Sequence, residues 1–97
     1  MKLQWSAAAA ASLAAFIELL HGVNPALSRV ARRDIRLRAG RLCKHPFMAR
    51  PSRWPGMREL SLTRWRKILV YRVEENQVRI VAFYDARQDL SRVTPKE

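Results

Sequence analysis

The chain of 97 residues has one cysteine, few acidic residues and no apolar run long enough to span a bilayer. A lone cysteine, Cys43, excludes an internal disulfide and suits a reducing compartment. Together with His21 and His45 it matches no zinc-ligand spacing, so we take it as a small core residue. The sequence also shows no internal repeat, low-complexity tract or dividing linker. These absences predict a single cytoplasmic domain with no metal and no cofactor.

The N-terminal segment resembles a secretion signal only in its composition, because Lys2 precedes an alanine-rich run. Glu18 interrupts the apolar residues, and no small-x-small cleavage site follows them. The apolar residues also recur with helical spacing. We therefore expect neither export nor a membrane partner.

The shortage of acidic residues leaves a strong excess of positive charge. Eight Asp and Glu residues stand against 19 Lys and Arg residues, which gives a formal net charge of +11. A surface this positive attracts polyanions and should bind nucleic acid or an acidic protein. Because such a chain repels itself, we expect it to be poorly soluble without a partner. The hydrophobic content of 48% excludes a disordered chain.

The second half of the sequence predicts a small sheet. Runs rich in Val, Ile, Leu and aromatic residues occupy 55–62, 67–74 and 77–84. They predict three antiparallel strands in meander order, with the middle strand most buried and Asn76 in the turn before the last. The alternation of polar and apolar residues at 2–5 predicts a further, short edge strand.

Two helices are predicted between the edge strand and the meander, folded back as a hairpin. Ser6 is the expected N-cap of the first helix, and Gly22 is expected to end it in the left-handed conformation. Asn24 is the expected cap of the second, with Pro25 at its first position and an end near Lys44. The first helix has an apolar stripe at helical spacing, formed by Leu13, Phe16, Ile17 and Leu20.

The element order β-α-α-β-β-β predicts an α+β fold, with an N-terminal strand and a helical hairpin packed on one face of a small antiparallel sheet. The proline-rich residues 47–56 are expected to form an ordered loop, in which Trp54 packs against the domain. Both faces of the sheet are rich in apolar residues, but one hairpin covers only one face. An uncovered apolar face edged with arginine predicts a bound partner.

Several segments carry a family resemblance in their order and spacing. They are the segments 2–6, 24–25, 45–51, 55–60, 68–73 and 86–90, together with the alanine-rich run between the first two. In this arrangement they resemble the RelE/ParE superfamily of bacterial type II toxins. The resemblance covers residues 1–90 as a single toxin domain and leaves 91–97 as a polar C-terminal tail. It implies a small basic toxin in a hetero-oligomeric complex with a cognate antitoxin, whose binding segment is acidic or amphipathic.

The resemblance divides into two functional branches. Residues 50–60 read Arg-Pro-x-x-x-Pro-Gly-x-Arg-Glu-Leu, which resembles ParE-type sequences more closely. That likeness implies a protein that blocks DNA gyrase without being an enzyme itself. The alternative is a RelE-like endoribonuclease that cuts mRNA on the ribosome. For that activity the resemblance implies that Arg58 and Arg87 hold the phosphate and that Tyr84 transfers a proton.

Two departures count against the ribonuclease branch. The loop before the Gly-x-Arg element holds arginines where RelE-type enzymes tend to carry lysines, and nothing aromatic follows Arg87. Arg58 and Tyr84 also have structural interpretations that compete with their roles in a ribonuclease. Arg58 is as well placed to pair with Glu59 or Asp89 across the sheet, and Tyr84 is expected to pack.

The antitoxin is expected on the sheet face that the helices leave uncovered. That face holds either Leu69, Tyr71, Val73, Val81 and Phe83, or the residues that alternate with them. The predicted partner-binding residues are Arg58, Arg72, Arg79, Tyr71 and Phe83. Four arginines on the outer side of the second helix, Arg29, Arg32, Arg33 and Arg36, are expected to form a solvated helix face.

Overall fold

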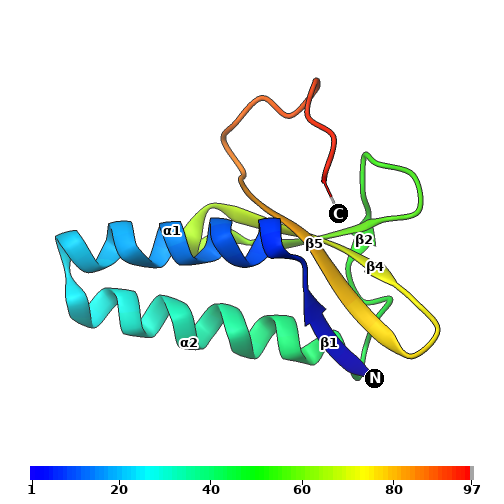
Figure 1. The fold of residues 1–97 in the computed structure, drawn as a ribbon, viewed down its shortest axis with the longest axis horizontal. Helices are drawn as coiled ribbons and strands as arrows, with labels where there is room; N and C mark the ends of the chain where they lie inside the picture. Colours follow the sequence, from blue (N-terminus) through cyan, green and yellow to red (C-terminus); the bar gives the residue numbers. More distant parts are fainter. Residues whose placement is uncertain (97) are drawn as a thin grey trace.

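The computed structural model describes residues 1–96, and within them two long helices pack against a five-stranded sheet (Figure 1). The elements are β1 Lys2–Trp5, α1 Ala7–Val23, α2 Pro25–Arg41, β2 Arg50–Pro51, β3 Arg58–Leu62, a 3-10 turn η1 Thr63–Trp65, β4 Lys67–Val73 and β5 Gln77–Asp85. The predicted α+β layout is confirmed, as are the three strands of the meander.

The sheet differs from the prediction at both edges. Its strand order is β1-β5-β4-β3-β2, and β1 runs parallel to β5 while the other neighbours are antiparallel. The edge strand is therefore confirmed, but the sheet is mixed. At the opposite edge, residues expected in a loop form β2, which pairs Arg50 with Glu59 and Pro51 with Arg58. A proline is tolerated there because an edge strand does not need every N–H for pairing.

An extra residue in β5 decides which side chains face the helices. Tyr71 pairs with Ile80, but the preceding Val70 pairs with Ala82, so Val81 is an additional residue in β5. Beyond this β-bulge the alternation of faces reverses. The prediction that Val81 shares a face with Tyr71 is wrong, because simple alternation takes no account of a bulge.

The two faces of the sheet carry separate apolar clusters. The face toward the helices, called here the helix face, includes Leu69, Tyr71, Val78, Ile80 and Phe83. The opposite face, called the tail face, includes Ile68, Val70, Val81, Ala82 and Tyr84. The central strand β4 contributes buried residues to both clusters, as expected for the middle of the meander.

The C-terminal segment covers part of the tail face. It leaves β5, arches beside α1 and returns toward the strands (Figure 1). Leu90 and Pro95 are buried, and the Trp54 indole N–H donates a hydrogen bond of 2.7 Å to the carbonyl of Val93. The packing of Trp54 is thus confirmed. The polar tail expected from the sequence instead closes part of the face that was predicted to be uncovered.

One residue, Asn24, caps both helices of the hairpin. Its backbone N–H donates to the Leu20 carbonyl at 2.7 Å, and its side-chain oxygen accepts from the Leu27 N–H at 3.2 Å. The cap by Asn24 is confirmed. The prediction that Gly22 ends α1 in the left-handed conformation is wrong. The helix continues to Val23, and the extended backbone of Asn24 turns the chain.

A hydrogen bond joins α2 to the turn η1, which connects β3 with β4. The Trp65 indole N–H, at the turn before β4, donates to the Asp34 carboxylate at 2.8 Å. This bond lowers the pKa of Asp34, as does the neighbouring Arg38. The helix ends at Arg41, three residues earlier than expected, and Cys43 lies half-buried in the turn that follows.

Ser6 joins the start of α1 to the bulge in β5. Its hydroxyl accepts from the Ala9 N–H, which confirms the predicted cap, and donates to the Val81 carbonyl, both at 3.1 Å. The Ser6 N–H also donates to the Ile80 carbonyl at 2.8 Å. Because a bulge interrupts regular pairing, the buried hydroxyl supplies a donor where the ladder is disturbed.

Ser6→Ala is therefore expected to lower the free energy of unfolding by about 2 kcal/mol, since it removes a helix cap and the donor to a buried carbonyl. Urea denaturation followed by circular dichroism measures the change. Ser12→Ala, an exposed site in the same helix, is the matched control and should change stability by less than about 0.5 kcal/mol. Equal effects of the two substitutions would contradict the role given to Ser6.

Candidate functional site

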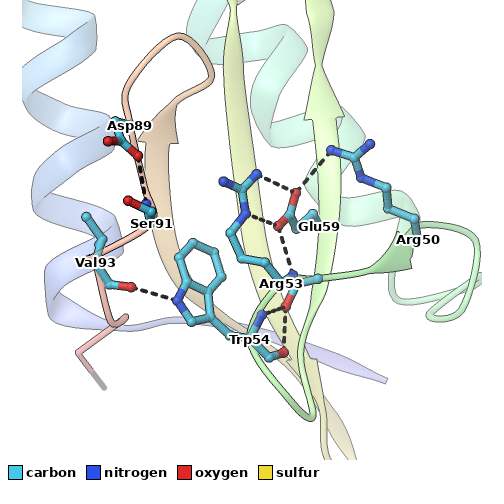
Figure 2. Close-up of polar contacts among 8 residues, drawn as sticks. Arg50, Arg53, Trp54, Glu59, Asp89, Ser91 and Val93 are labelled. Carbon is cyan, nitrogen blue, oxygen red and sulfur yellow. Dashed lines mark hydrogen bonds and ion pairs between the residues drawn. The ribbon is translucent and has the colours of Figure 1, made fainter.

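A buried carboxylate on the tail face gathers two arginines. Glu59 is only 3% exposed and lies between Arg50 and Arg53 (Figure 2). The Arg53 Nε donates to Glu59 Oε1 at 2.9 Å, and the Arg50 Nη2 donates to Oε2 at 3.1 Å. The backbone N–H of Arg53 also donates to Oε1, at 3.3 Å. Two charged side chains and one backbone group therefore converge on a single carboxylate.

Glu59 reaches this position because of its place in β3. Arg58, Leu60 and Leu62 point to one side of the strand, and Glu59 points to the other. Its rung continues across the sheet to Val70 and then Ala82, both on the tail face. A carboxylate on an apolar face needs hydrogen-bonding cations, and the arginines of the preceding loop supply them.

The electrostatics of Glu59 follow from two opposing causes. Burial alone raises the pKa of this carboxyl group. The hydrogen bonds from Arg53 and Arg50 outweigh that effect, so the pKa lies below its usual value of 4.5. In turn, the bond to Glu59 raises the pKa of Arg53. The cluster is thus fully ionised near neutral pH, with one positive charge in excess.

Both arginines keep much of their surface open. The side chains of Arg50 and Arg53 are 64% and 45% exposed although each is bound to Glu59. A guanidinium group carries five N–H donors, and the carboxylate occupies only some of them. The exposed part of each guanidinium group therefore suits recognition of an external carboxylate or phosphate.

The segment that carries these arginines, residues 46–57, is called here the proline loop because it contains Pro46, Pro51 and Pro55. Three local features hold its second half. Ser52 exchanges hydrogen bonds with the backbone of Trp54, the Met57 N–H donates to the Trp54 carbonyl, and Gly56 supplies a φ of +78° for the turn. A side chain at residue 56 would be strained there.

Arg58 and Tyr71 hold the first half of the proline loop. The Arg58 Nη1 donates to the Ala49 carbonyl at 2.8 Å, and the Tyr71 hydroxyl donates to the Pro46 carbonyl at 2.7 Å. The Arg58 guanidinium also stacks 4.9 Å from the ring centre of Phe47. The expected pairing of Arg58 with Glu59 or Asp89 is wrong. The side chain lies on the opposite face from Glu59 and binds a backbone carbonyl.

The predicted partner-binding residues do not form one surface. Tyr71 and Phe83 face the helices and are 0% and 4% exposed, so neither offers a contact surface in this structure. Arg72 and Arg79 are direct cross-strand neighbours on the tail face, and Arg72 lies 3.7 Å from Glu74. The sequence left open which sheet face the helices do not cover. In the structure it is the tail face, which carries Arg72 and Arg79. Arg58 lies on the other face.

The residues assigned to a ribonuclease do not meet either. Arg58 is opposite Tyr71, whereas Asp85, which binds Arg87 at 3.0 Å, is opposite Lys67. Those two rungs are four residues apart, or about 13 Å along the strand. Tyr84 lies on the tail face with its ring 5.6 Å from Trp54, and burial raises the pKa of its hydroxyl. The three groups thus face different directions.

A second candidate surface runs between the two helices. One hollow of about 250 Å³ begins at Trp5, and another of about 540 Å³ extends to His21. They share Ala14, Ile17 and Arg32, so they form one groove, called here the hairpin groove. Arginines at helical spacing line its α2 side, namely Arg29, Arg32 and Arg36. Two of the four arginines expected only to be solvated, Arg32 and Arg36, thus border an alanine-lined hollow beside Trp5.

No three His, Cys, Asp or Glu side chains within residues 1–96 lie close enough together to hold a metal ion. No helix in the same range is long and apolar enough to cross a membrane.

Two features of the site were missed by sequence reasoning. The Glu59 cluster depends on pairing between β2 and β3, and the only signal for it was an acidic residue alternating with Leu60 on a strand. The exposure of Phe47 and Met48, at 63% and 55%, contradicts their apolar character and had no signal in the pattern.

Glu59→Gln is expected to lower the free energy of unfolding by about 2 kcal/mol, because charge-assisted hydrogen bonds to both arginines are lost. Chemical denaturation at neutral pH measures the loss. Glu75→Gln, at an exposed position in the β4–β5 turn, is the matched control and should stay within about 0.5 kcal/mol of the unchanged protein.

The same variant gives a test by pH. The pKa of Glu59 is lowered by folding, so the unfolded chain takes up a proton first as the pH falls below 4.5. The unchanged protein should lose this part of its stability between that pH and the lower pKa of the folded state. The stability difference from Glu59→Gln should shrink over the same range. A difference that is constant with pH contradicts the ionised pairing.

Comparison with known proteins gives the family. Residues 3–90 match the family described as the ParE toxin of the type II toxin-antitoxin system parDE. No curated protein sequence matches the chain. Among solved structures, a chain of the chromosomal ParDE TA system from P. aeruginosa is similar, with a TM-score of 0.80 and 29% identity. That alignment covers 90% of this chain and 97% of the other. The protein therefore belongs to the ParE toxin family of type II toxin–antitoxin systems.

Proposed function

We propose that this protein is the toxin of a toxin–antitoxin pair, that it stops growth by inhibiting DNA gyrase in the cytoplasm, and that a cognate antitoxin neutralises it. The observation that carries the proposal is the family match over residues 3–90. The similarity to a chain of a ParDE system supports the presence of an antitoxin partner. Inhibition of gyrase is the activity that the ParE-like sequence between residues 50 and 60 implies.

The geometry favours a binding protein over an enzyme. A ribonuclease needs a phosphate-holding cation and a proton-transfer group on either side of one scissile bond. Arg58 is engaged with the Ala49 carbonyl, Arg87 with Asp85, and Tyr84 packs against Trp54. No observation on these three residues favours cleavage of mRNA as a second function.

The antitoxin is placed in the hairpin groove under this proposal. The tail face, where the sequence suggested it, is partly occupied by the chain's own C-terminal segment. The hairpin groove combines an alanine-lined side with a row of arginines, and Glu18 is the acidic residue among those that line it. Small apolar residues and an excess of arginines over the single Glu18 in the lining fit an amphipathic helix with acidic flanks.

Purified protein is expected to prevent gyrase from supercoiling relaxed plasmid DNA and to leave mRNA intact on translating ribosomes. Gel electrophoresis of the plasmid and primer extension on the mRNA measure the two outcomes. Protein preincubated with antitoxin is the control and should leave gyrase active. Cleaved mRNA together with unimpaired gyrase would show that the target is wrong.

Ala14→Trp is expected to weaken antitoxin binding at least about tenfold, because the larger side chain fills the hairpin groove at the point its two hollows share. Isothermal titration measures the dissociation constant. Ala11→Trp is the matched control on an exposed position of α1 outside the groove and should bind as the unchanged protein does. Equal affinities of the two variants would remove the groove as the antitoxin site.

A further inference from the structure

We infer that the proline loop, residues 46–57, is the surface that contacts the toxin's protein target, and that it recognises an acidic patch with a projecting apolar side chain. This inference rests on the proposed function. It assigns the target to a surface separate from the hairpin groove, so that target and antitoxin are bound by different residues.

The first observation is a pair of large apolar side chains in water. Phe47 and Met48 are adjacent in the chain and each is more than half exposed. Apolar residues exposed singly are ordinary on a protein surface, but two neighbours beside several arginines are a different case. Aromatic residues, methionine and arginine are the types enriched at protein–protein interfaces.

The second observation is that hydrogen bonds anchor the loop to the sheet although its tip is exposed. Its carbonyls at Pro46 and Ala49 accept hydrogen bonds from Tyr71 and Arg58, and its backbone N–H at Arg53 donates to Glu59. Each of those three side chains belongs to the sheet. A surface segment held in this way loses little conformational entropy when it binds, and this favours affinity.

The third observation concerns shape and charge. A hollow of about 290 Å³ lies beside the exposed ring, lined by Phe47, Pro51, Gly56, Met57, Arg58 and Val73. It can receive an apolar side chain of the partner. On the tail-face side of the same loop, Arg50 and Arg53 share one carboxylate and so retain one net positive charge and open N–H donors. This arrangement complements a partner with a carboxylate beside an apolar group.

The apolar residues also discriminate between classes of partner. A nucleic-acid backbone would satisfy the arginines, but it offers no apolar group for Phe47 and Met48 unless a base is unstacked. Burial of both side chains therefore favours a protein surface. Glu59 acts here as a positioning residue, since it fixes the orientation of Arg50 and Arg53 and is itself too buried to reach a partner.

The test uses the full-length protein in a gyrase supercoiling assay. A loop variant carries Phe47→Ser with Arg50→Ser. A matched control carries Leu37→Ser with Arg33→Ser, which likewise removes one large apolar side chain and one arginine, from an exposed part of α2 outside the groove. Met48→Ser is a second loop variant, and it removes none of the hydrogen bonds of Glu59 or Arg58. The loop variants should need at least about tenfold more protein for half-inhibition, as expected for interface anchors, and the control less than about twofold. All three should bind antitoxin as tightly as the unchanged protein, which shows that they are folded.

The outcomes separate this inference from the proposed function. If the unchanged protein inhibits gyrase and the loop variants inhibit equally well, the loop is not the target surface, while the proposed function stands. If the unchanged protein does not inhibit gyrase, both fail. Retention on duplex DNA without gyrase is measured in parallel. The inference is overturned if the variant with Phe47→Ser and Arg50→Ser is no longer retained on DNA while Met48→Ser behaves as the unchanged protein in both assays. That result would identify a nucleic-acid ligand.

Discussion

The arrangement of the sheet depends on a β-bulge, in which β5 has one residue more than the paired part of β4. Val81 shifts the side chains that follow it by one position, so that Phe83 faces the helices and Tyr84 the opposite side. The hydroxyl of Ser6 binds the carbonyl at this point and also begins α1. The direction in which the helical hairpin leaves the sheet is therefore coupled to the bulge. The position of the hairpin groove therefore depends on the bulge.

Several of the scarce acidic residues form ion pairs within the chain. Within residues 1–96, Asp34, Glu59, Glu74 and Asp85 form ion pairs with arginine or lysine. Three of these carboxylates also accept hydrogen bonds that join elements. Asp34 binds the turn η1 to α2, Glu59 binds the proline loop to the sheet, and Asp85 binds the residues that follow β5. Few negative charges are left to balance the exposed arginines. The excess positive charge of the chain thus lies at the surface, and the hairpin groove and the proline loop each bear part of it.

The sequence was sufficient for features that depend on neighbouring residues. Caps at Ser6 and Asn24, and the strands β3 to β5, follow from side chains within a few positions of each other. Features that depend on distant pairing were not accessible. The bulge at Val81 requires the register of β5 against β4, and the Glu59 cluster requires the contact of β2 with β3. Apolar content alone also could not show that the C-terminal segment covers the tail face.

The double use of Asn24 has a consequence for engineering the chain. Val23 is 79% exposed, and the tip of the hairpin looks like a site where extra residues are tolerated. However, the donor that ends α1 and the acceptor that begins α2 belong to the same residue, so an insertion there separates the two caps. A peptide tag placed at the tip would leave one helix without its terminal hydrogen bond and change the angle between the helices. A label is better attached at the surface of α1, at a position such as Ala11, where no cap is involved.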